Sequence, residues 1–121
     1  MPAKKVLIVD DSPTDRYFLT ATLTSKGYQC VTAENGEQGI AMSKAEQPDL
    51  IVMDVVMPGI DGYKATRTIT RDEATKHIPV ILCTSKNQET DRVWGLRQGA
   101  KEFLVKPVDA RELIAAVAAS A

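Results

Sequence analysis

Four short apolar runs, each continuous rather than alternating with polar residues, constrain most strongly what this chain can fold into. A strand that is apolar on both sides is covered on both faces, as in a parallel sheet between two layers of helices. A fifth and more mixed run, at 28–33, fits a strand nearer the edge of such a sheet. The four continuous runs lie at residues 6–9, 50–53, 79–83 and 103–105.

The stretches between these runs carry the start and stop signals of helices. Ser12 followed by Pro13 is typical of a helix cap and a first helical residue, and Gly27 fits the position just past a helix end. Asn35 and Asp109 are suited to begin further helices. Strand and helix then alternate five times, which predicts one α/β domain with right-handed crossovers. The expected helices cover 14–26, 37–46, 63–70, 88–98 and 110–119.

The length and charge of the chain are those of one ordinary domain. Its 121 residues suffice for one sizeable core, and we expect a single domain over 1–121 with no output domain. With 15 Lys and Arg against 16 Asp and Glu, the chain offers no general attraction to nucleic acid.

No apolar run approaches the ~20 residues that span a bilayer, so we expect a cytoplasmic protein with no membrane segment. Cys30 and Cys83 lie in apolar runs and are expected to be reduced core thiols.

Polar residues follow the four continuous runs at the point where each predicted strand ends. Open parallel sheets bind ligands at the carboxyl ends of their strands, so we expect these side chains to gather at one edge. A single aspartate at the end of a strand is typical of an ordinary cap or turn residue. Several such polar residues at the ends of neighbouring strands indicate a functional site. The residues concerned are Asp10, Asp11, Asp54, Thr84 and Lys106.

Three carboxylates at one place repel one another unless a cation is bound or one carboxyl keeps its proton. Mg2+ suits such a group because it takes oxygen ligands and keeps positions for water and a phosphate oxygen. An ionised Asp54 beside the ion is a competent nucleophile toward phosphorus. Lys106 and Thr84 offer the phosphoryl oxygens a positive charge and a hydroxyl hydrogen. The sequence therefore predicts phosphoryl transfer to an aspartate.

Short motifs stand in a characteristic order along the chain: Asp10-Asp11, Asp54, Met57-Pro58-Gly59 with Asp61-Gly62, Thr84, and Lys106-Pro107. As an ordered set they resemble the receiver domain of bacterial response regulators, over about residues 5–119. The resemblance implies a CheY-like, flavodoxin-like fold. In that fold a doubly wound parallel sheet has five strands in the order 2-1-3-4-5 and is accompanied by five helices.

The resemblance also implies a role for each residue of the set. Asp54 would be the phosphoacceptor, and the donor would be a phosphohistidine on a sensor histidine kinase or phosphotransfer protein. Thr84 and Lys106 would contact the phosphoryl group, and the peptide bond after Lys106 would be cis. The implied Mg2+ ligands are Asp11, Asp54, the backbone carbonyl of Val56 and, assisting them, Asp10.

A switch is implied at two further positions. Thr84 would move toward the phosphoryl group, and Phe103 would swing inward behind it. Phe103 departs from the tyrosine common in chemotaxis-type members, since it has no hydroxyl, and a plain core aromatic is an equal interpretation of it. A downstream protein is expected to bind the face formed by the helix at 88–98, the strand at 103–105 and the helix at 110–119. The chain itself is expected to be a monomer or weak dimer.

The helix at 88–98 carries the single tryptophan, Trp94. Positions 93, 96, 97 and 100 form one stripe and positions 91, 94, 95 and 98 another, and the pattern leaves open which stripe packs on the sheet. We interpret Trp94 as a packing residue, with a partner anchor as the alternative.

Two positions are expected to set the lifetime of the phosphoryl group. Val56 lies two residues after Asp54, and Lys86 lies two residues after Thr84. In receiver domains, the side chains at these two positions flank the path of the water that hydrolyses the acyl phosphate. A bulky apolar side chain and a cation there should hinder the attacking water. We therefore expect slower autodephosphorylation than in fast chemotaxis-type receivers.

The sequence around these motifs, at residues 10–14, 53–59 and 88–95, resembles CheY-like regulators of twitching motility of the PilH/PilG type. This resemblance implies a role in type IV pilus or taxis-type motility. On this interpretation the chain signals and is not a turnover enzyme. A Mg2+-dependent phosphatase with an aspartyl nucleophile would need a second acid where Val56 stands. A flavodoxin would need a hydroxyl-rich phosphate loop where Asp10 and Asp11 stand. A phosphate sink and a receiver-like module that is never phosphorylated stay open.

Overall fold

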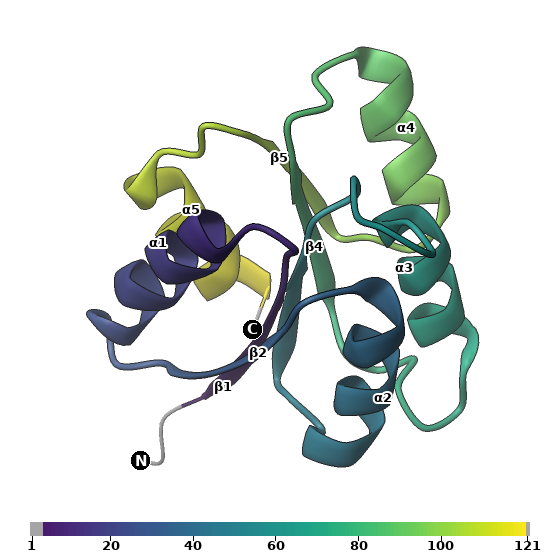
Figure 1. Ribbon diagram of the computed structural model, residues 1–121, viewed down its shortest axis with the longest axis horizontal. Helices are drawn as coiled ribbons and strands as arrows, with labels where there is room; N and C mark the ends of the chain where they lie inside the picture. Colours follow the sequence, from purple (N-terminus) through teal and green to yellow (C-terminus); the bar gives the residue numbers. More distant parts are fainter. Residues whose placement is uncertain (1–3, 121) are drawn as a thin grey trace.

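Strands and helices alternate along the chain in the computed structural model, which describes residues 4–120 (Figure 1). The predicted α/β architecture is confirmed, with five strands and five helices among these residues. The elements are β1 (Lys5–Val9), α1 (Pro13–Thr24), β2 (Gln29–Ala33), α2 (Gly36–Glu46), β3 (Leu50–Met53), α3 (Gly62–Arg71), β4 (Val80–Thr84), α4 (Glu89–Arg97), β5 (Glu102–Val105) and α5 (Ala110–Ser120).

The strands form one parallel sheet in the order β2-β1-β3-β4-β5. This is the predicted 2-1-3-4-5 order, and the mixed run at 28–33 does supply an edge strand. Strand order reverses beside β1, because β2 lies on one side of it and β3 on the other. Crevices at such switch points are where open α/β sheets bind ligands.

Helices cover both faces of the sheet, with α1 and α5 on one side and α2, α3 and α4 on the other (Figure 1). The side chains of β1 show why its sequence is apolar without alternation. Leu7 and Val9 are buried in the core beneath α2 and α3, while Val6 and Ile8 are buried in the core beneath α1 and α5. Each fully buried aliphatic side chain of this size contributes ~1.5–3 kcal/mol to folding.

The first helix begins and ends with the local devices that its sequence indicates. Ser12 accepts a hydrogen bond from the backbone N–H of Asp15 at 3.2 Å, and Pro13 is the first helical residue. The helix ends at Thr24 rather than at the expected residue 26. The reason is a tighter closing turn, in which the N–H of Gly27 donates to the carbonyl of Thr24 at 3.0 Å. Gly27 then takes a φ of +90°, which favours glycine.

Both cysteines are free thiols, as predicted. Cys83 is buried in β4, and burial raises the pKa of its thiol to about 12. Cys30 is only partly buried, because it lies on the edge strand β2.

Within residues 4–120, no helix combines the length and the apolar character needed to cross a membrane.

Candidate functional site

The carboxyl ends of β1 and β3 bring three acids together. The backbone N–H of Asp54 donates to the carbonyl of Val9 at 2.9 Å, which ties the end of β3 to the end of β1. Carboxylate oxygens of Asp10, Asp11 and Asp54 lie within 4.8 Å of one another. Asp10 and Asp54 are buried, whereas Asp11 is exposed. The structure therefore assembles the acidic group that the strand ends predict.

Lys106 reaches into this group from the end of β5. Its Nζ lies 2.7 Å from Asp10 Oδ2, 2.8 Å from Asp15 Oδ2 and 3.3 Å from Asp54 Oδ2. Its backbone N–H donates to the carbonyl of Thr84 at 2.8 Å, and the peptide bond that follows is cis, as expected. One ammonium thus faces three carboxylates.

Burial and charge act in opposite directions on this ion cluster. Burial lowers the pKa of Lys106, but its contacts with Asp10 and Asp15 and the charge of Asp54 outweigh burial and raise that pKa above its ordinary value. Lys106 therefore stays charged. Burial raises the pKa of the Asp10 carboxyl, and the ammonium of Lys106 and the N–H of Ser12 oppose that rise. The ionised form of Asp10 thus depends on the lysine.

The two carboxylate oxygens of Asp54 have different partners. Its Oδ1 accepts a hydrogen bond from the backbone N–H of Val55 at 2.7 Å, while its Oδ2 faces Lys106. Only 7% of Asp54 is exposed, so little of its surface is open to solvent. Thr84 is buried at the end of the neighbouring strand β4, and its Oγ1 accepts from the N–H of Lys86 at 3.3 Å. The five predicted site residues all lie at this edge of the sheet.

Asp15 is the site residue that sequence reasoning missed. It has the appearance of an ordinary acid in the first turn of α1, yet its carboxylate is as close to Lys106 as that of Asp10. The only available signal was its place in the helix that starts immediately after Asp10 and Asp11. Val56 is 54% exposed and lies in the loop after β3.

The α4 helix packs on the sheet through a glycine. Gly95 and Gln98 are buried, so the stripe of positions 91, 94, 95 and 98 faces inward. A Cβ on Gly95 would lie 2.7 Å from Leu82 Cδ1 and 3.0 Å from Phe103 Cδ2. Phe103 is thus partly buried beneath α4, in contact with the core. Trp94 remains 49% exposed at the rim of this stripe, so it packs on one side only.

The donor set of the acidic group fits a hard divalent cation. All its side-chain ligands are carboxylate oxygens, two of them buried, and Asp11 offers an exposed carboxylate toward solvent. Mg2+ binds through few carboxylates and keeps several waters, so a group with one open side suits it. Lys106 offsets only part of the negative charge, which leaves the group attractive to a cation.

Comparison with known proteins identifies the family. The model of the response regulator receiver domain matches residues 6–118. The chain is 54% identical to Protein PilH of Pseudomonas aeruginosa over 110 residues, which is 91% of each chain. It spans between 25% and 50% of the length of other curated relatives that it matches.

Solved structures agree in fold. The chemotaxis protein CheY4 of Vibrio cholerae superposes with a TM-score of 0.92 at 28% identity, over 98% of this chain and 99% of that one. The receiver domain of sensor histidine kinase PA1611 from Pseudomonas aeruginosa has a TM-score of 0.90 at 30% identity, over 98% and 97%. That structure holds a magnesium ion in its active site cleft. With its match to the family model over residues 6–118, its CheY-like fold and its acid cluster, this chain belongs to the response regulator receiver domain family.

Proposed function

We propose that this receiver accepts a phosphoryl group on Asp54 from a phosphohistidine of a sensor histidine kinase or phosphotransfer protein. The observation that carries the proposal is the ammonium of Lys106, 3.3 Å from Asp54 Oδ2 and 2.7 Å from Asp10 Oδ2, within one acidic cluster. Such a site can place a carboxylate nucleophile and gather the charge of a phosphoryl group.

In the proposed reaction a carboxylate oxygen of Asp54 attacks phosphorus, and the P–N bond to the donor imidazole breaks. The electron pair of that bond returns to the imidazole nitrogen, and an acyl phosphate forms on Asp54. Lys106 pairs with one phosphoryl oxygen, and the Thr84 hydroxyl donates a hydrogen bond to another. Mg2+, when bound, supplies further neutralisation of charge on the carboxylate and phosphoryl oxygens. The proposed ligands of the ion are Asp10, Asp11, Asp54 and the backbone carbonyl of Val56.

The donor is expected to approach over α1. Tyr17 is 77% exposed and Phe18 is 41% exposed, which is unusual for side chains of this size. A cavity of about 270 Å³ lies between Phe18 and the segment of Lys106 and Pro107. An apolar surface beside the nucleophile supports docking of a partner that presents its phosphohistidine to Asp54.

The proposed readout passes through α4 and β5. Phosphorylation adds negative charge and oxygen acceptors at Asp54, and Thr84 would shift toward them. Phe103 packs against Gly95, so a change at β5 reaches α4 directly. Val93 of α4 and Val105 of β5 are 37% and 40% exposed, which supports a downstream protein binding at the α4–β5–α5 face.

The proposed pathway is type IV pilus or taxis-type motility. The similarity to PilH over 91% of both chains supports it. The partner that binds the form phosphorylated on Asp54 decides between two roles. The receiver either transmits the signal or drains phosphate from a second regulator. We propose no turnover chemistry beyond phosphorylation and dephosphorylation of Asp54.

Intact-mass measurement after incubation with acetyl phosphate and Mg2+ tests the proposal. We expect one added phosphoryl group in the wild type, none in Asp54→Asn, and a much smaller fraction in Asp11→Asn or in the presence of EDTA. Glu112→Gln, an exposed position on α5, is the matched control and should be modified like the wild type. Equal modification of Asp54→Asn and wild type would contradict the proposal.

A further inference from the structure

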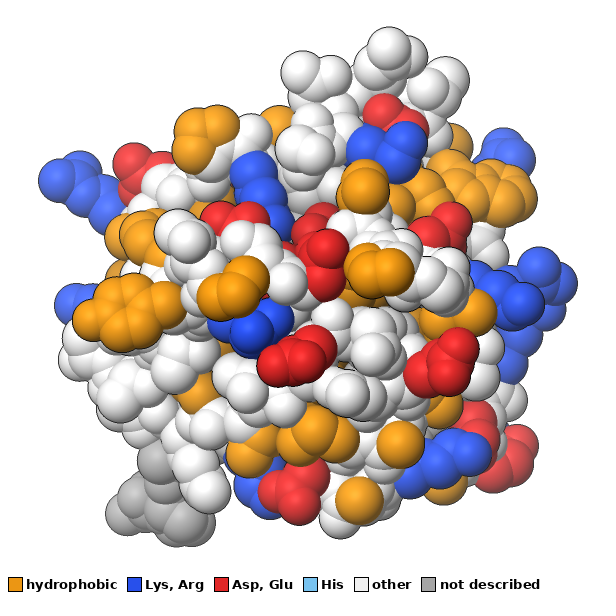
Figure 2. All heavy atoms as spheres, viewed as in Figure 1, with side chains coloured by type: hydrophobic (Ala, Val, Ile, Leu, Met, Phe, Trp, Pro, Cys, Tyr) orange, Lys and Arg blue, Asp and Glu red, His pale blue; other side chains and the backbone are white. Residues whose placement is uncertain are grey.

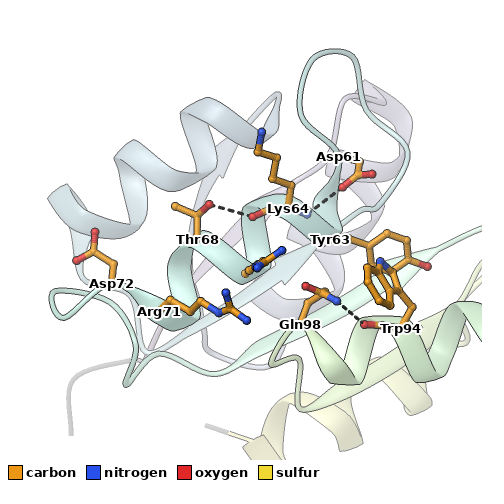
Figure 3. A pocket seen from close by; sticks show the side chains of 9 residues that line it. Asp61, Tyr63, Lys64, Thr68, Arg71, Asp72, Trp94 and Gln98 are labelled. Atoms are coloured by element: carbon orange, nitrogen blue, oxygen red, sulfur yellow. Dashed lines mark hydrogen bonds between the residues drawn. The ribbon is translucent and has the colours of Figure 1, made fainter.

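A second hollow lies between α3 and α4, on residues that take no part in the strand-end site. It is a cavity of about 610 Å³ lined by residues of both helices (Figure 3). Ligand-binding clefts in proteins fall in the range of about 300–1,000 Å³. We call it the α3–α4 groove, with walls formed by residues 61–72 on the α3 side, by Trp94 of α4 and by Gln98, which follows α4.

Three cations of α3 line this groove without a carboxylate partner. Lys64, Arg67 and Arg71 follow one another at helical spacing and are all exposed. Among residues 4–120, none of the three lies within 4.0 Å of a carboxylate oxygen. Figure 2, which has the same view as Figure 1, shows several Lys and Arg side chains near the right-hand edge of the molecule, on the side where Figure 1 places α3.

The two acids of the groove already have partners. Asp72 pairs with Lys44 of α2 at 3.1 Å, which offsets its charge. Asp61 caps α3 by accepting a hydrogen bond from the backbone N–H of Lys64 at 2.9 Å. The local charge of the groove is therefore positive, although the whole chain has a net charge of -1.

An aromatic end and two ties between the helices complete the groove. Tyr63 and the half-exposed Trp94 lie together at one end in Figure 3 and both line the cavity. The Tyr63 hydroxyl donates to the carbonyl of Asp91 at 3.2 Å. At the other end, the Thr70 hydroxyl donates to the carbonyl of Gln98 at 2.8 Å. Because the walls are held at both ends, binding requires little ordering of the groove.

The arrangement of the cations selects the occupant. Lys64 and Arg71 are seven residues apart, which corresponds to about 10 Å along a helix. In Figure 3 the side chains of Lys64 and Arg71 extend from α3 in different directions and do not converge on one point. A compact anion such as a phosphate would meet one of them at a time. A segment with several carboxylates in a row would meet them all.

We infer that the α3–α4 groove binds an acidic segment of a partner protein that inserts one apolar side chain between Tyr63 and Trp94. Charge complementarity along α3 gives this contact its specificity, and the half-exposed indole gives it an anchor. The face is separate from the α4–β5–α5 surface proposed for the downstream target. Two partners of different chemistry can therefore engage the same helix α4 from its two sides.

The sole tryptophan makes a direct assay available. The probe is a 12-residue helical peptide with three glutamates at the spacing of the three cations and one leucine; its counterpart carries lysines instead of glutamates. At low salt we expect a saturable change in Trp94 emission with the acidic peptide and none with the lysine peptide. Amide chemical shifts should change at residues 61–72 and 91–98.

Charge-reversal variants decide the outcome. Arg67→Glu with Arg71→Glu should weaken peptide binding by at least about tenfold. Lys26→Glu with Arg111→Glu reverses two exposed charges outside the groove, so it makes a matched charge change elsewhere, and its binding should stay within about twofold. Unchanged melting temperatures and unchanged phosphorylation of Asp54 in both variants show that the fold and the strand-end site are intact. No saturable signal, equal weakening by Lys26→Glu with Arg111→Glu, or binding of ADP in place of the peptide would each overturn the inference.

Discussion

Replacing Lys106 by methionine isolates the electrostatics of the strand-end site. Methionine keeps the unbranched stem but removes the ammonium that lies 2.7 Å from Asp10, 2.8 Å from Asp15 and 3.3 Å from Asp54. Asp10 is 1% exposed and Asp54 is 7% exposed, so neither carboxylate can recover its hydration without a structural change. The variant should therefore be destabilised in buffer that contains EDTA.

The size of the effect follows from burial. Removing one partner of a fully buried ion pair costs about 3–5 kcal/mol. The Lys106 side chain is 16% exposed and that of Asp15 is 41% exposed, so part of the lost interaction is replaced by water. We expect a loss of about 2–3 kcal/mol in the free energy of unfolding, which lowers the melting temperature by roughly 10 °C.

Urea unfolding at several pH values and Mg2+ concentrations is the measurement. Without the ammonium, burial raises the pKa of Asp10 further above that of an unfolded aspartate, so the folded variant binds protons more readily than the unfolded chain. Its stability should consequently rise as pH falls from neutrality toward 3.8, the ordinary pKa of an aspartate. In the wild type, the contribution of Lys106 is lost only as pH rises past 10.5, its ordinary pKa, toward its higher folded value.

Mg2+ should stabilise the variant more than the wild type, because the cluster has lost its built-in cation and binds the ion more tightly. Lys101→Met, an exposed position on the loop before β5, is the control and should change stability by less than about 0.5 kcal/mol. A Lys106→Met variant that is as stable as wild type in EDTA, with the same pH dependence, would refute the reasoning.

Three further results are expected. The acyl phosphate should outlast that of fast chemotaxis-type receivers because Val56 hinders the attacking water, and a half-life of a few seconds by mass spectrometry would contradict this. Gly62→Ala should lower both stability and phosphorylation rate, by about 1–3 kcal/mol for the former, because its Cβ would overlap the backbone carbonyl oxygen of Asp54. Cys30 should react with a thiol reagent before Cys83, whose pKa of about 12 and burial protect it until the protein unfolds, and equal rates in native protein would show otherwise.

The sheet was predictable because the pattern behind it is local. The side chains of β1 alternate between two buried cores, so its run of apolar residues already indicates cover on both faces. The acids that end β1 and β3 follow these runs directly, and parallel strands bring their carboxyl ends to one edge. Asp10 and Asp54 could thus be brought together without knowing any long-range contact.

Other features depend on contacts that no local pattern carries. Asp15 and Lys106 are 91 residues apart in the sequence, and no sequence pattern near Asp15 indicates that it contacts Lys106. The inward face of α4 is set by Gly95, whose missing side chain lets the helix approach Leu82. A search for hydrophobic side chains at helical spacing gives little weight to a glycine. The pattern therefore does not decide which stripe of α4 packs on the sheet. The α3–α4 groove likewise exists only once the two helices are placed side by side.

Chemical trapping of the modified residue tests the central claim most directly. Protein phosphorylated by acetyl phosphate is reduced with borohydride, which converts an aspartyl phosphate to homoserine, and the peptide that spans Asp54 is sequenced by mass spectrometry. We expect homoserine at position 54, with a yield that depends on Mg2+ and falls in Lys106→Met. Homoserine at another aspartate, or none in protein that has gained a phosphoryl group, would contradict it.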